Sequence, residues 1–383
     1  MNCQEVSLRL GKGAQAESQL PSFSFPMQFK PSALARKCET VFFISDRLLA
    51  AMKCILTESY GGPEVLQVEE VPVPQVGPNG VLVRIHATSV NPLDWKLRQG
   101  LLRPVMDLRF PIILGCDFSG VVEKVGNSVT LFKPGDEVYG FKDGRVGKTY
   151  RGTYAEYAVA PEKAVARKPA NLSHEEAAAM PVAAVSAWQG LVKYGKIKAG
   201  SRVLIHAGAG GVGSFAIQTA KAFGAYVAAT ASGRNQDLLR ELGADLPIDY
   251  EQERFEEKIS GYDVVLDNVG KSVWGGSLSV LKPGGRLVSL VPPSPKEPAG
   301  KLRFFASTGS QVAGWALRGL LTGKFLTLLM VKPQGGELEK LTALVEAGKV
   351  KPVIQKVYSL EEIAEAHTVS EQGHVRGKLV LRI

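Results

Sequence analysis

A glycine-rich turn near the middle of the chain has the residue types needed to hold a phosphate group. It reads AGAGGVG from Ala207 to Gly213, follows the apolar run RVLIH and precedes the helix-like run SFAIQTAKAFG. Small residues at 207, 210 and 213 permit a tight turn, close approach to a diphosphate, and close packing of helix on strand. The helix N-terminus adds N–H groups that attract an anion. The turn therefore predicts a dinucleotide site built from Ala207, Gly210, Gly211, Val212 and Gly213.

The residues after the next strand, YVAATA, indicate which dinucleotide is bound. NAD-dependent proteins usually place a carboxylate at this strand end to hold the ribose hydroxyls. Here the chain continues with Ser232, Gly233 and Arg234, and Asp237 comes late enough to lie on the following helix. Ser232 and Arg234 supply hydrogen-bond donors suited to a 2′-phosphate. The sequence therefore favours NADPH over NADH.

Strands and helices alternate around this turn. Ser173, followed by Glu176, forms a capping pattern, and the strands RVLIHA, YVAATA, DVVLDNV and RLVSLV then alternate with helical segments. Such alternation is typical of an α/β fold with a parallel sheet. We expect this doubly wound sheet to occupy residues 177–327.

The flanking regions have a different pattern. Residues 52–176 are rich in short strands separated by Pro and Gly, and runs such as VLVRIHATSVNP alternate as half-buried strands do, which predicts a barrel-like β domain. Residues 328–383 end in another strand, which we expect to return to that domain. Residues 1–51 are rich in Ser, Gln and Pro without an apolar period. They are either an organelle transit peptide, although Glu5 and Glu17 are unusual in one, or an unstructured extension.

The charge pattern argues against nucleic-acid binding, and the apolar pattern argues against a membrane-spanning segment. The net charge is +9, but Lys and Arg are scattered among acids, which argues against nucleic-acid binding and suits a field around an anionic cofactor. The most apolar stretch, 312–331, is interrupted by Arg318 and Lys324, so no transmembrane segment is expected. Peripheral membrane association stays open.

The cysteines indicate a reducing compartment. None of the four forms a C-x-x-C pair, so we expect neither a disulfide framework nor a four-cysteine zinc site; they are Cys3, Cys38, Cys54 and Cys116. A cytoplasmic protein is the first expectation, and a plastid or mitochondrial one is the alternative if residues 1–51 are a transit peptide.

From Met52 to Ile383 the chain resembles the medium-chain dehydrogenase/reductase superfamily, and most of all its quinone oxidoreductase and alkenal reductase branch. The resemblance rests on landmarks in the family's order: YGGPEVL (60–66), SVNPLD (89–94), GCDFSGVV (115–122), KPGDEV (133–138), the glycine-rich turn, and DNVG (267–270). It implies a GroES-like β-barrel catalytic domain at 52–176 and 328–383, a Rossmann domain at 177–327, and a substrate bound between them.

The resemblance also indicates whether the site holds a catalytic zinc ion. Zinc alcohol dehydrogenases carry Cys where this chain has Asn91, and His-Glu where it has Cys116 and Asp117. Their third ligand falls near Met180. No catalytic zinc is therefore expected, and the hydride acceptor should spread its own negative charge, as a quinone or an α,β-unsaturated carbonyl does.

Four residues are implied at the reacting end of the cleft, with alternatives for three. Asn91 is expected to contact cofactor or substrate. Asp94 either shares that contact or holds the loop. Lys96 stands where some bacterial members have Tyr; it is either a donor to a developing oxyanion or a solvated or phosphate-facing lysine. Tyr60 is either a second donor or an aromatic that packs in a turn.

On the cofactor side the resemblance implies further contacts. Ser186 is expected to face the nicotinamide, Tyr250 to lie against the adenosine phosphate, and Asn268 and Leu290 to border the nicotinamide ribose. Of the histidines, His206 is expected to be structural. Three others, His174, His367 and His374, are expected at the surface.

The sequence predicts a function and a homodimer, and it leaves two alternative functions open. The chain is predicted to be an NADPH-dependent reductase of quinones or enones, and a homodimer that extends its sheet near Leu326 to Val331. One rival is an alcohol dehydrogenase acting on saturated carbonyls. The other is a regulatory or crystallin-like protein that binds NADPH without turnover.

Overall fold

The computed structural model describes residues 51–383, except for 105, 144, 147, 148, 292–308, 311, 316 and 320. The predicted extension therefore lies outside the described residues, apart from Ala51, which begins the first strand. Leu49–Ile383 forms one compact unit. The proposed domain boundaries at 176/177 and 327/328 stay predictions.

The second half of the chain builds a six-stranded parallel sheet in the order β13-β12-β11-β14-β15-β16. Its strands are β11 (Arg202–Ile205), β12 (Tyr226–Ala231), β13 (Leu246–Asp249), β14 (Tyr262–Asp267), β15 (Leu281–Ser289) and β16 (Phe325–Leu328). The central β11 and β14 are almost wholly buried, as expected for parallel strands covered on both faces. Counted along the chain, the order is 3-2-1-4-5-6, which is that of a Rossmann domain. The predicted α/β class is confirmed.

The first half builds mainly antiparallel sheets. A seven-stranded sheet runs β10-β6-β5-β3-β18-β17, with β9 also paired to β3. Its strands are β3 (Gly80–Val90), β5 (Asp117–Val125), β6 (Glu137–Phe141), β9 (Tyr157–Pro161), β10 (Val165–Arg167), β17 (Ile354–Ser359) and β18 (Lys378–Arg382). Smaller sheets contain β1 (Ala51–Thr57), β2 (Gln67–Pro72) and β4 (Ile112–Ile113), and β7 (Arg145–Val146) with β8 (Thr149–Tyr150). The expected return of the C-terminal strand is confirmed, because β18 pairs antiparallel with β3.

The alternation predicted for the strand over 81–90 is wrong. Along β3 only Arg84 is exposed and His86 is half-buried. Strands β5, β9 and β18 pair with β3, and helix α3 (His174–Ala178) packs on it, so both of its faces lie inside the protein.

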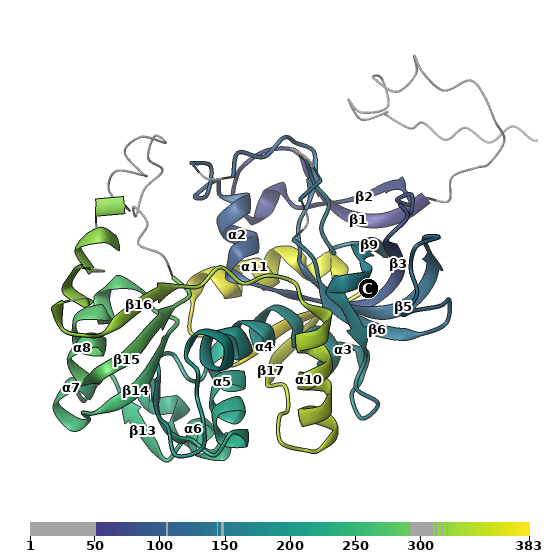
Figure 1. The fold of residues 1–383 in the computed structure, drawn as a ribbon. Helices are drawn as coiled ribbons and strands as arrows, with labels where there is room; N and C mark the ends of the chain where they lie inside the picture. The colour runs from purple at the N-terminus through teal and green to yellow at the C-terminus, as the bar shows by residue number, and fades with distance from the viewer. Residues whose placement is uncertain are drawn as a thin grey trace, which may run out of the picture. The chain divides into compact units, whose positions relative to one another are not determined.

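Helices flank the six-stranded parallel sheet and the seven-stranded sheet (Figure 1). They are α2 (Pro92–Arg98), α3, α4 (Pro181–Trp188), α5 (Gly211–Ala222), α6 (Gln236–Glu241), α7 (Phe255–Lys258), α8 (Trp274–Val280), α10 (Gly335–Glu346) and α11 (Ile363–Gln372). Short 3₁₀ turns are η1 (Pro63–Val65), η2 (Glu162–Ala164), η4 (Gly233–Asn235), η5 (Lys271–Val273) and η6 (Leu360–Glu362), and η3 (Gln189–Tyr194) is a π-helical turn. The predicted capping box is confirmed: Ser173 Oγ accepts from the N–H of Glu176, whose carboxylate accepts from the N–H of Ser173. None of the helices in the described part of the chain is long and apolar enough to cross a membrane.

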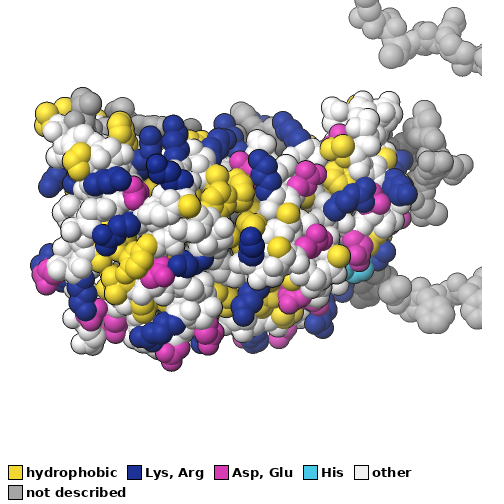
Figure 2. Space-filling model, turned by 60° about the horizontal axis from the view of Figure 1, so that its bottom comes forward, with side chains coloured by type: hydrophobic (Ala, Val, Ile, Leu, Met, Phe, Trp, Pro, Cys, Tyr) yellow, Lys and Arg dark blue, Asp and Glu magenta, His cyan; other side chains and the backbone are white. Residues whose placement is uncertain are grey.

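Charged side chains are mixed on the face drawn in Figure 2. Lys and Arg are interspersed there with Asp and Glu, with small apolar areas between them. This arrangement agrees with the scattered charges of the sequence.

Candidate functional site

The glycine-rich turn joins β11 to α5 in a conformation that favours small residues. Ala207 has a φ of +52°, in the left-handed region that glycine adopts most easily. Gly210 is the N-cap of α5 and has extended backbone. The N–H of Gly208 donates to the carbonyl oxygen of Thr230 at 2.8 Å, which fixes the turn against β12. The turn thus lies at the carboxyl end of the central strands, where doubly wound sheets bind ligands.

Two glycines of the turn serve different purposes. A Cβ on Gly213 would collide with backbone atoms of Ala207 and Gly208, so only glycine lets α5 approach β11 this closely. A Cβ on Gly210 would meet only the carbonyl oxygen of Ala207, at 3.4 Å. Gly210 therefore leaves space on the side where a ligand would approach.

A cavity of about 380 Å³ opens at this turn. Most of the predicted site residues line it: Asn91, Ala207, Gly210, Gly211, Val212, Gly213, Ser232, Tyr250 and Asn268. The other predicted residues do not line it: Tyr60, Asp94, Lys96, Ser186, Arg234 and Leu290. Residues that were not predicted for the site also line it, among them Asn235, His374 and Lys378.

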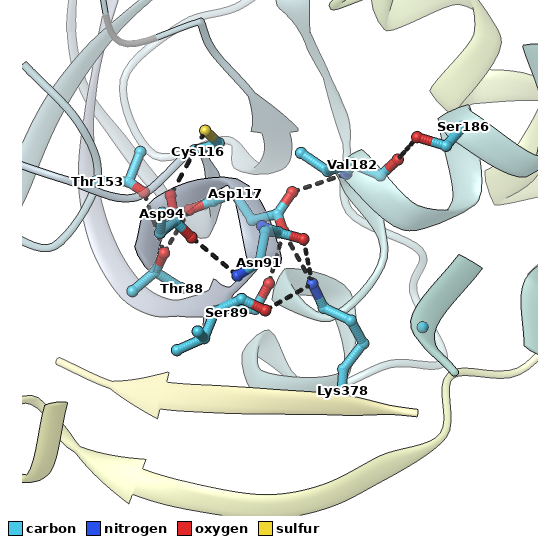
Figure 3. Close-up of polar contacts among 12 residues, drawn as sticks. Thr88, Ser89, Asn91, Asp94, Cys116, Asp117, Thr153, Val182, Ser186 and Lys378 are labelled. Carbon is cyan, nitrogen blue, oxygen red and sulfur yellow. Dashed lines mark hydrogen bonds and ion pairs between the residues drawn. The ribbon is translucent and has the colours of Figure 1, made fainter. Parts of the chain in front are cut away.

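Asp117, at the start of β5, is a buried carboxylate that accepts hydrogen bonds from several donors near this cavity (Figure 3). Its Oδ2 accepts from Ser89 Oγ at 2.6 Å and from Asn91 Nδ2 at 2.8 Å, and Lys378 Nζ lies 3.4 Å away. Its Oδ1 accepts from the N–H of Val182 at 2.7 Å. The carboxylate thereby joins β3, β5, β18 and α4.

The importance of Asp117 was missed by sequence reasoning, which treated it only as the counterpart of a zinc ligand. A signal was present: the acid stands inside the apolar run GCDFSGVV, and fully buried acids are nearly always paired. Its partner Lys378 lies 261 residues away, so no local spacing predicts the pair.

Asp94 lies beside the cavity without lining it. Its Oδ2 accepts from the N–H of Asn91 at 2.8 Å and from the hydroxyl of Tyr154 at 2.9 Å. Burial raises the pKa of Asp94 to about 6, although both hydrogen bonds act in the opposite direction. Of the two alternatives for Asp94, these contacts favour the one in which it holds the first turn of α2.

The expected surface position of His367 is wrong. The side chain is fully buried, and its Nε2 lies 3.3 Å from the hydroxyl of Tyr154, which in turn contacts Asp94. His367 follows Ile363 and Ala366 at helical spacing, so it falls on the buried face of α11. Burial lowers its pKa to about 3, and the Arg98 guanidinium adds to this effect.

Three other histidines divide between core and surface. His206 is buried between Thr230 and Ser277, as expected for a structural residue, and burial lowers its pKa to about 4. His174 is half-buried, with its Nδ1 2.8 Å from the hydroxyl of Ser119, so its expected surface position is only partly right. His374 is exposed and lines the cavity.

Mild acid is expected to destabilise the protein through His206 and His367. Both take up a proton near pH 6.5 when unfolded but stay neutral in the folded protein until much lower pH, so the unfolded state binds more protons and stability falls as the pH falls. From pH 6.5 to 5 each histidine should remove about 2 kcal/mol from the free energy of unfolding. H367Q keeps a polar partner for Tyr154 and should abolish one of these losses. Urea unfolding of both proteins at the two pH values measures this.

Asp94 raises the free energy of unfolding as the pH falls toward 4. Its pKa is raised in the folded protein, so the folded state binds more protons than the unfolded state in this range. Asp94 makes the same contribution in wild type and in H367Q. The difference in pH dependence between the two proteins therefore reports on His367 alone. An equal loss of stability in the two proteins would contradict the prediction.

Lys96 and Tyr60 lie outside the cavity lining. Lys96 is half-buried on α2, burial lowers its pKa, and its Nζ lies 5.3 Å from the centre of the Trp95 ring. The Tyr60 hydroxyl accepts from the N–H of Leu108 at 3.0 Å, and its ring meets Phe110 edge-on at 4.7 Å. These contacts favour the turn-packing alternative for Tyr60.

Ser186 and Leu290 also face protein. Ser186 Oγ donates to the carbonyl oxygen of Val182 at 2.6 Å, within its own helix. Leu290 is half-buried against the core that surrounds α4 and α5. Their predicted contacts with the nicotinamide end stay predictions.

The outer end of the cavity combines donors with nearby acids. Ser232 and Tyr250 line it, and the exposed Arg234 donates to the carbonyl oxygen of His374 at 3.3 Å. Sequence reasoning found no carboxylate at the end of β12. The fold brings one from the neighbouring strand, because Glu251, just after β13, accepts from the N–H of Gly233 at 3.4 Å. The donors favour a ligand with a 2′-phosphate, whereas this acid favours a ligand with a free ribose hydroxyl.

An unpaired acceptor supports a dinucleotide in this cavity. Asn268 donates through Nδ2 to the carbonyl oxygen of His206 at 2.9 Å, while its Oδ1 is buried without a hydrogen-bond partner among the described residues. A buried acceptor without a partner is costly, and a ligand hydroxyl can satisfy it. The turn, the helix N-terminus and this acceptor together fit a ribose-diphosphate ligand.

The predicted counterparts of zinc ligands point apart. Cys116 Sγ lies 3.9 Å from Asp94 Oδ1, whereas Asp117 turns toward Asn91. Within the part of the chain that is described, no group of three or more His, Cys, Asp or Glu side chains is placed to hold a metal ion.

Comparison with known proteins places the chain in a family. Two family models match: "Alcohol dehydrogenase GroES-like domain" over residues 77–170 and "Zinc-binding dehydrogenase" over residues 242–381. The NAD(P)H oxidoreductase RTN4IP1, mitochondrial, of Mus musculus is 36% identical over 357 residues, which cover 87% of this chain and 89% of that protein. The NADPH-dependent alkenal/one oxidoreductase, chloroplastic, of Arabidopsis thaliana is 37% identical over 337 residues, which cover 86% and 79%.

A solved structure agrees with these relatives. The quinone oxidoreductase from Coxiella burnetii is 36% identical and superposes with a TM-score of 0.76, over 87% of this chain and 100% of that one. The matches extend across the antiparallel and the parallel sheet, which confirms the predicted GroES-like and Rossmann architecture. The chain is therefore an oxidoreductase of the medium-chain dehydrogenase/reductase superfamily and belongs to its quinone oxidoreductase branch.

Proposed function

We propose that this protein is an NADPH-dependent reductase of quinones or α,β-unsaturated carbonyls that works without zinc. The observation that carries the proposal is that one cavity is lined both by the glycine-rich turn and by Asn91. The names of the relatives, an NADPH-dependent alkenal/one oxidoreductase and a quinone oxidoreductase, support the cofactor and the substrate class.

The chain's own residues divide the work of holding the cofactor. NADPH, when bound, supplies a hydride to the substrate. The N–H groups at the start of α5, over residues 211–213, have no partner within the helix and would hold the diphosphate. Ser232, Arg234 and Tyr250 serve the phosphorylated adenosine end. Asn268 satisfies its buried oxygen on a ribose hydroxyl.

Asn91 serves the reacting end. Its amide is fixed by buried partners, so it can donate to a ligand oxygen without reorganising. A quinone or an enone spreads the negative charge of its reduced form, and a neutral donor is then adequate. A saturated ketone yields a localised alkoxide, for which zinc enzymes use the metal. Lys96 keeps its predicted alternative as a second donor.

A substrate panel tests the proposal. Purified protein is mixed with NADPH and with a soluble quinone, an alkenal or a saturated ketone, and NADPH oxidation is followed together with the zinc content. We expect saturable turnover of the quinone or the alkenal at substoichiometric zinc. Turnover of the saturated ketone alone, with stoichiometric zinc, would favour the alcohol dehydrogenase. Tight NADPH binding without turnover of any compound would favour the non-catalytic regulator.

Removing the Arg234 guanidinium is expected to weaken NADPH selectively. A charge-assisted hydrogen bond to a phosphate contributes enough that R234A should raise the Kd for NADPH about tenfold. The Kd for NADH should stay nearly unchanged, because NADH has no 2′-phosphate. Fluorescence titration with both cofactors measures this, and R240A, an exposed arginine on α6, is the matched control. Equal weakening of the two cofactors would contradict the assignment.

We further propose a homodimer that extends the parallel sheet through β16. This strand is at the end of the sheet, and its Phe325 is 51% exposed. Light scattering of the purified protein tests the proposal, which a monomer at micromolar concentration would contradict.

Localisation stays a proposal as well. The two relatives are named mitochondrial and chloroplastic, which supports the alternative that residues 1–51 are a transit peptide over the cytoplasmic expectation. Imaging a fluorescent fusion with and without residues 1–51 distinguishes them.

A further inference from the structure

Lys378, the first residue of β18, is a buried cation with all of its donors engaged. It is 4% exposed and lines the cavity beside the glycine-rich turn. Its Nζ contacts the Oδ1 of Asn91 at 2.6 Å, the carbonyl oxygen of Val90 at 3.2 Å and the Oδ2 of Asp117 at 3.4 Å. An ammonium group has three N–H bonds, so these three acceptors account for all of them.

The partners of Asn91 determine which way its amide points. Its Oδ1 faces Lys378, which can only donate, and its Nδ2 faces the Asp117 carboxylate at 2.8 Å, which as an anion can only accept. The opposite orientation would set Nδ2 against the ammonium and Oδ1 against the carboxylate. The amide oxygen is thus occupied, and one of the two Nδ2 hydrogens is used by Asp117. Neither Asp117 nor Lys378 uses the second hydrogen, and Asn91 lines the cavity.

The same segment of chain holds the glycine-rich turn. The N–H of Gly377 donates to the carbonyl oxygen of Ala209 at 2.8 Å, and Gly377 forms a bridge with Gly210. A Cβ on Gly211 would lie 2.9 Å from the Cδ of Lys378. Residues 377 and 378 therefore contact both ends of the site, the phosphate-binding turn and the Asn91 amide.

We propose that Lys378 is a positioning residue that fixes the Asn91 side chain as a hydrogen-bond donor to a carbonyl oxygen of the bound ligand. The proposal rests on the proposed function for the identity of that ligand, a nicotinamide or an enone or quinone, each of which carries such an oxygen. It predicts that the site selects ligands with an acceptor at this point. It also predicts that loss of Lys378 acts through Asn91 and not through a contact of its own.

A double-mutant cycle on kcat/KM tests this directly. Lysine to methionine keeps most of the apolar length of the side chain and removes the donors. In the wild-type background K378M should lower kcat/KM about 30-fold, and in the N91A background less than about threefold, because coupled residues give non-additive effects. K349M, at an exposed lysine after α10, is the control and should leave kcat/KM unchanged. Losses that multiply in the double variant would overturn the proposal.

A spectroscopic measurement keeps the test independent of turnover and of simple misfolding. With asparagine labelled by ¹⁵N, the Asn91 Nδ2 hydrogen that Asp117 accepts, assigned by its absence in N91A, should exchange slowly in the unliganded wild type, because Lys378 keeps the amide in this orientation. K378M that retains the wild-type circular dichroism should lose this protection. If no substrate of the panel is turned over, the proposed function fails while this measurement still decides the role of Lys378. An unprotected Asn91 amide in the wild type, or full protection in K378M, would overturn that role.

Discussion

G210V is expected to raise the Kd for NADPH at least about 100-fold, a loss of roughly 2.7 kcal/mol in binding free energy. Gly210 precedes the first turn of α5, and its open side faces the cavity. A valine there would put two methyl groups where a diphosphate must approach the backbone. Fluorescence titration of the purified variant with NADPH measures the loss.

The structure of the unliganded protein should tolerate G210V. Gly210 has extended backbone that any residue adopts, and a Cβ there meets only one atom, at 3.4 Å. The free energy of unfolding should therefore change by about 1 kcal/mol or less, the usual cost of a poorer N-cap. G336V, at an exposed glycine of α10 whose Cβ would meet nothing within 4 Å, is the matched control. Unchanged NADPH affinity in G210V would show that the cofactor does not approach this turn.

D117A is expected to lower the free energy of unfolding by about 3–5 kcal/mol, as removal of one partner from a buried ion pair does. The substitution leaves the Lys378 ammonium with one acceptor fewer in a buried site. It also leaves the Ser89 hydroxyl, the Asn91 amide and the Val182 N–H without the acceptor they share. Each unpaired buried group adds its own desolvation cost. Urea unfolding at pH 7.5 measures the change.

Two variants separate the network from a general effect of losing an acid. D237A removes a carboxylate that is 91% exposed, and it should change the free energy of unfolding by less than about 0.5 kcal/mol. D117N combined with K378M removes both charges of the buried pair and should be more stable than D117A. If D117A were as stable as D237A, the buried network would have no structural importance.

The parts of the site that could be predicted from sequence are local. The glycine-rich turn and the end of β12 lie within 28 residues of each other, and each has a conformational or hydrogen-bonding requirement visible in its own residues. The alternation of strands and helices likewise predicted the parallel sheet. The short strand β13 was missed because its four residues include Pro247, which normally argues against a strand.

The parts that could not be predicted depend on contacts between distant segments. Asp117 meets Lys378 across 261 residues, and Glu251 reaches the turn after β12 from the neighbouring strand. Neither contact leaves a spacing in the sequence. His367 is a different case, because its helical spacing from the apolar Ile363 is a local signal for the buried face of α11, although a surface position was predicted.

Equilibrium titration of the purified protein with NADPH and NADH tests the central claim most directly. We expect saturable binding of NADPH at one site per chain, at least about tenfold tighter than NADH, with competition by a 2′-phosphorylated adenosine nucleotide. Absence of saturable NADPH binding, or tighter binding of NADH, would contradict the claim that the cavity at the glycine-rich turn holds this cofactor.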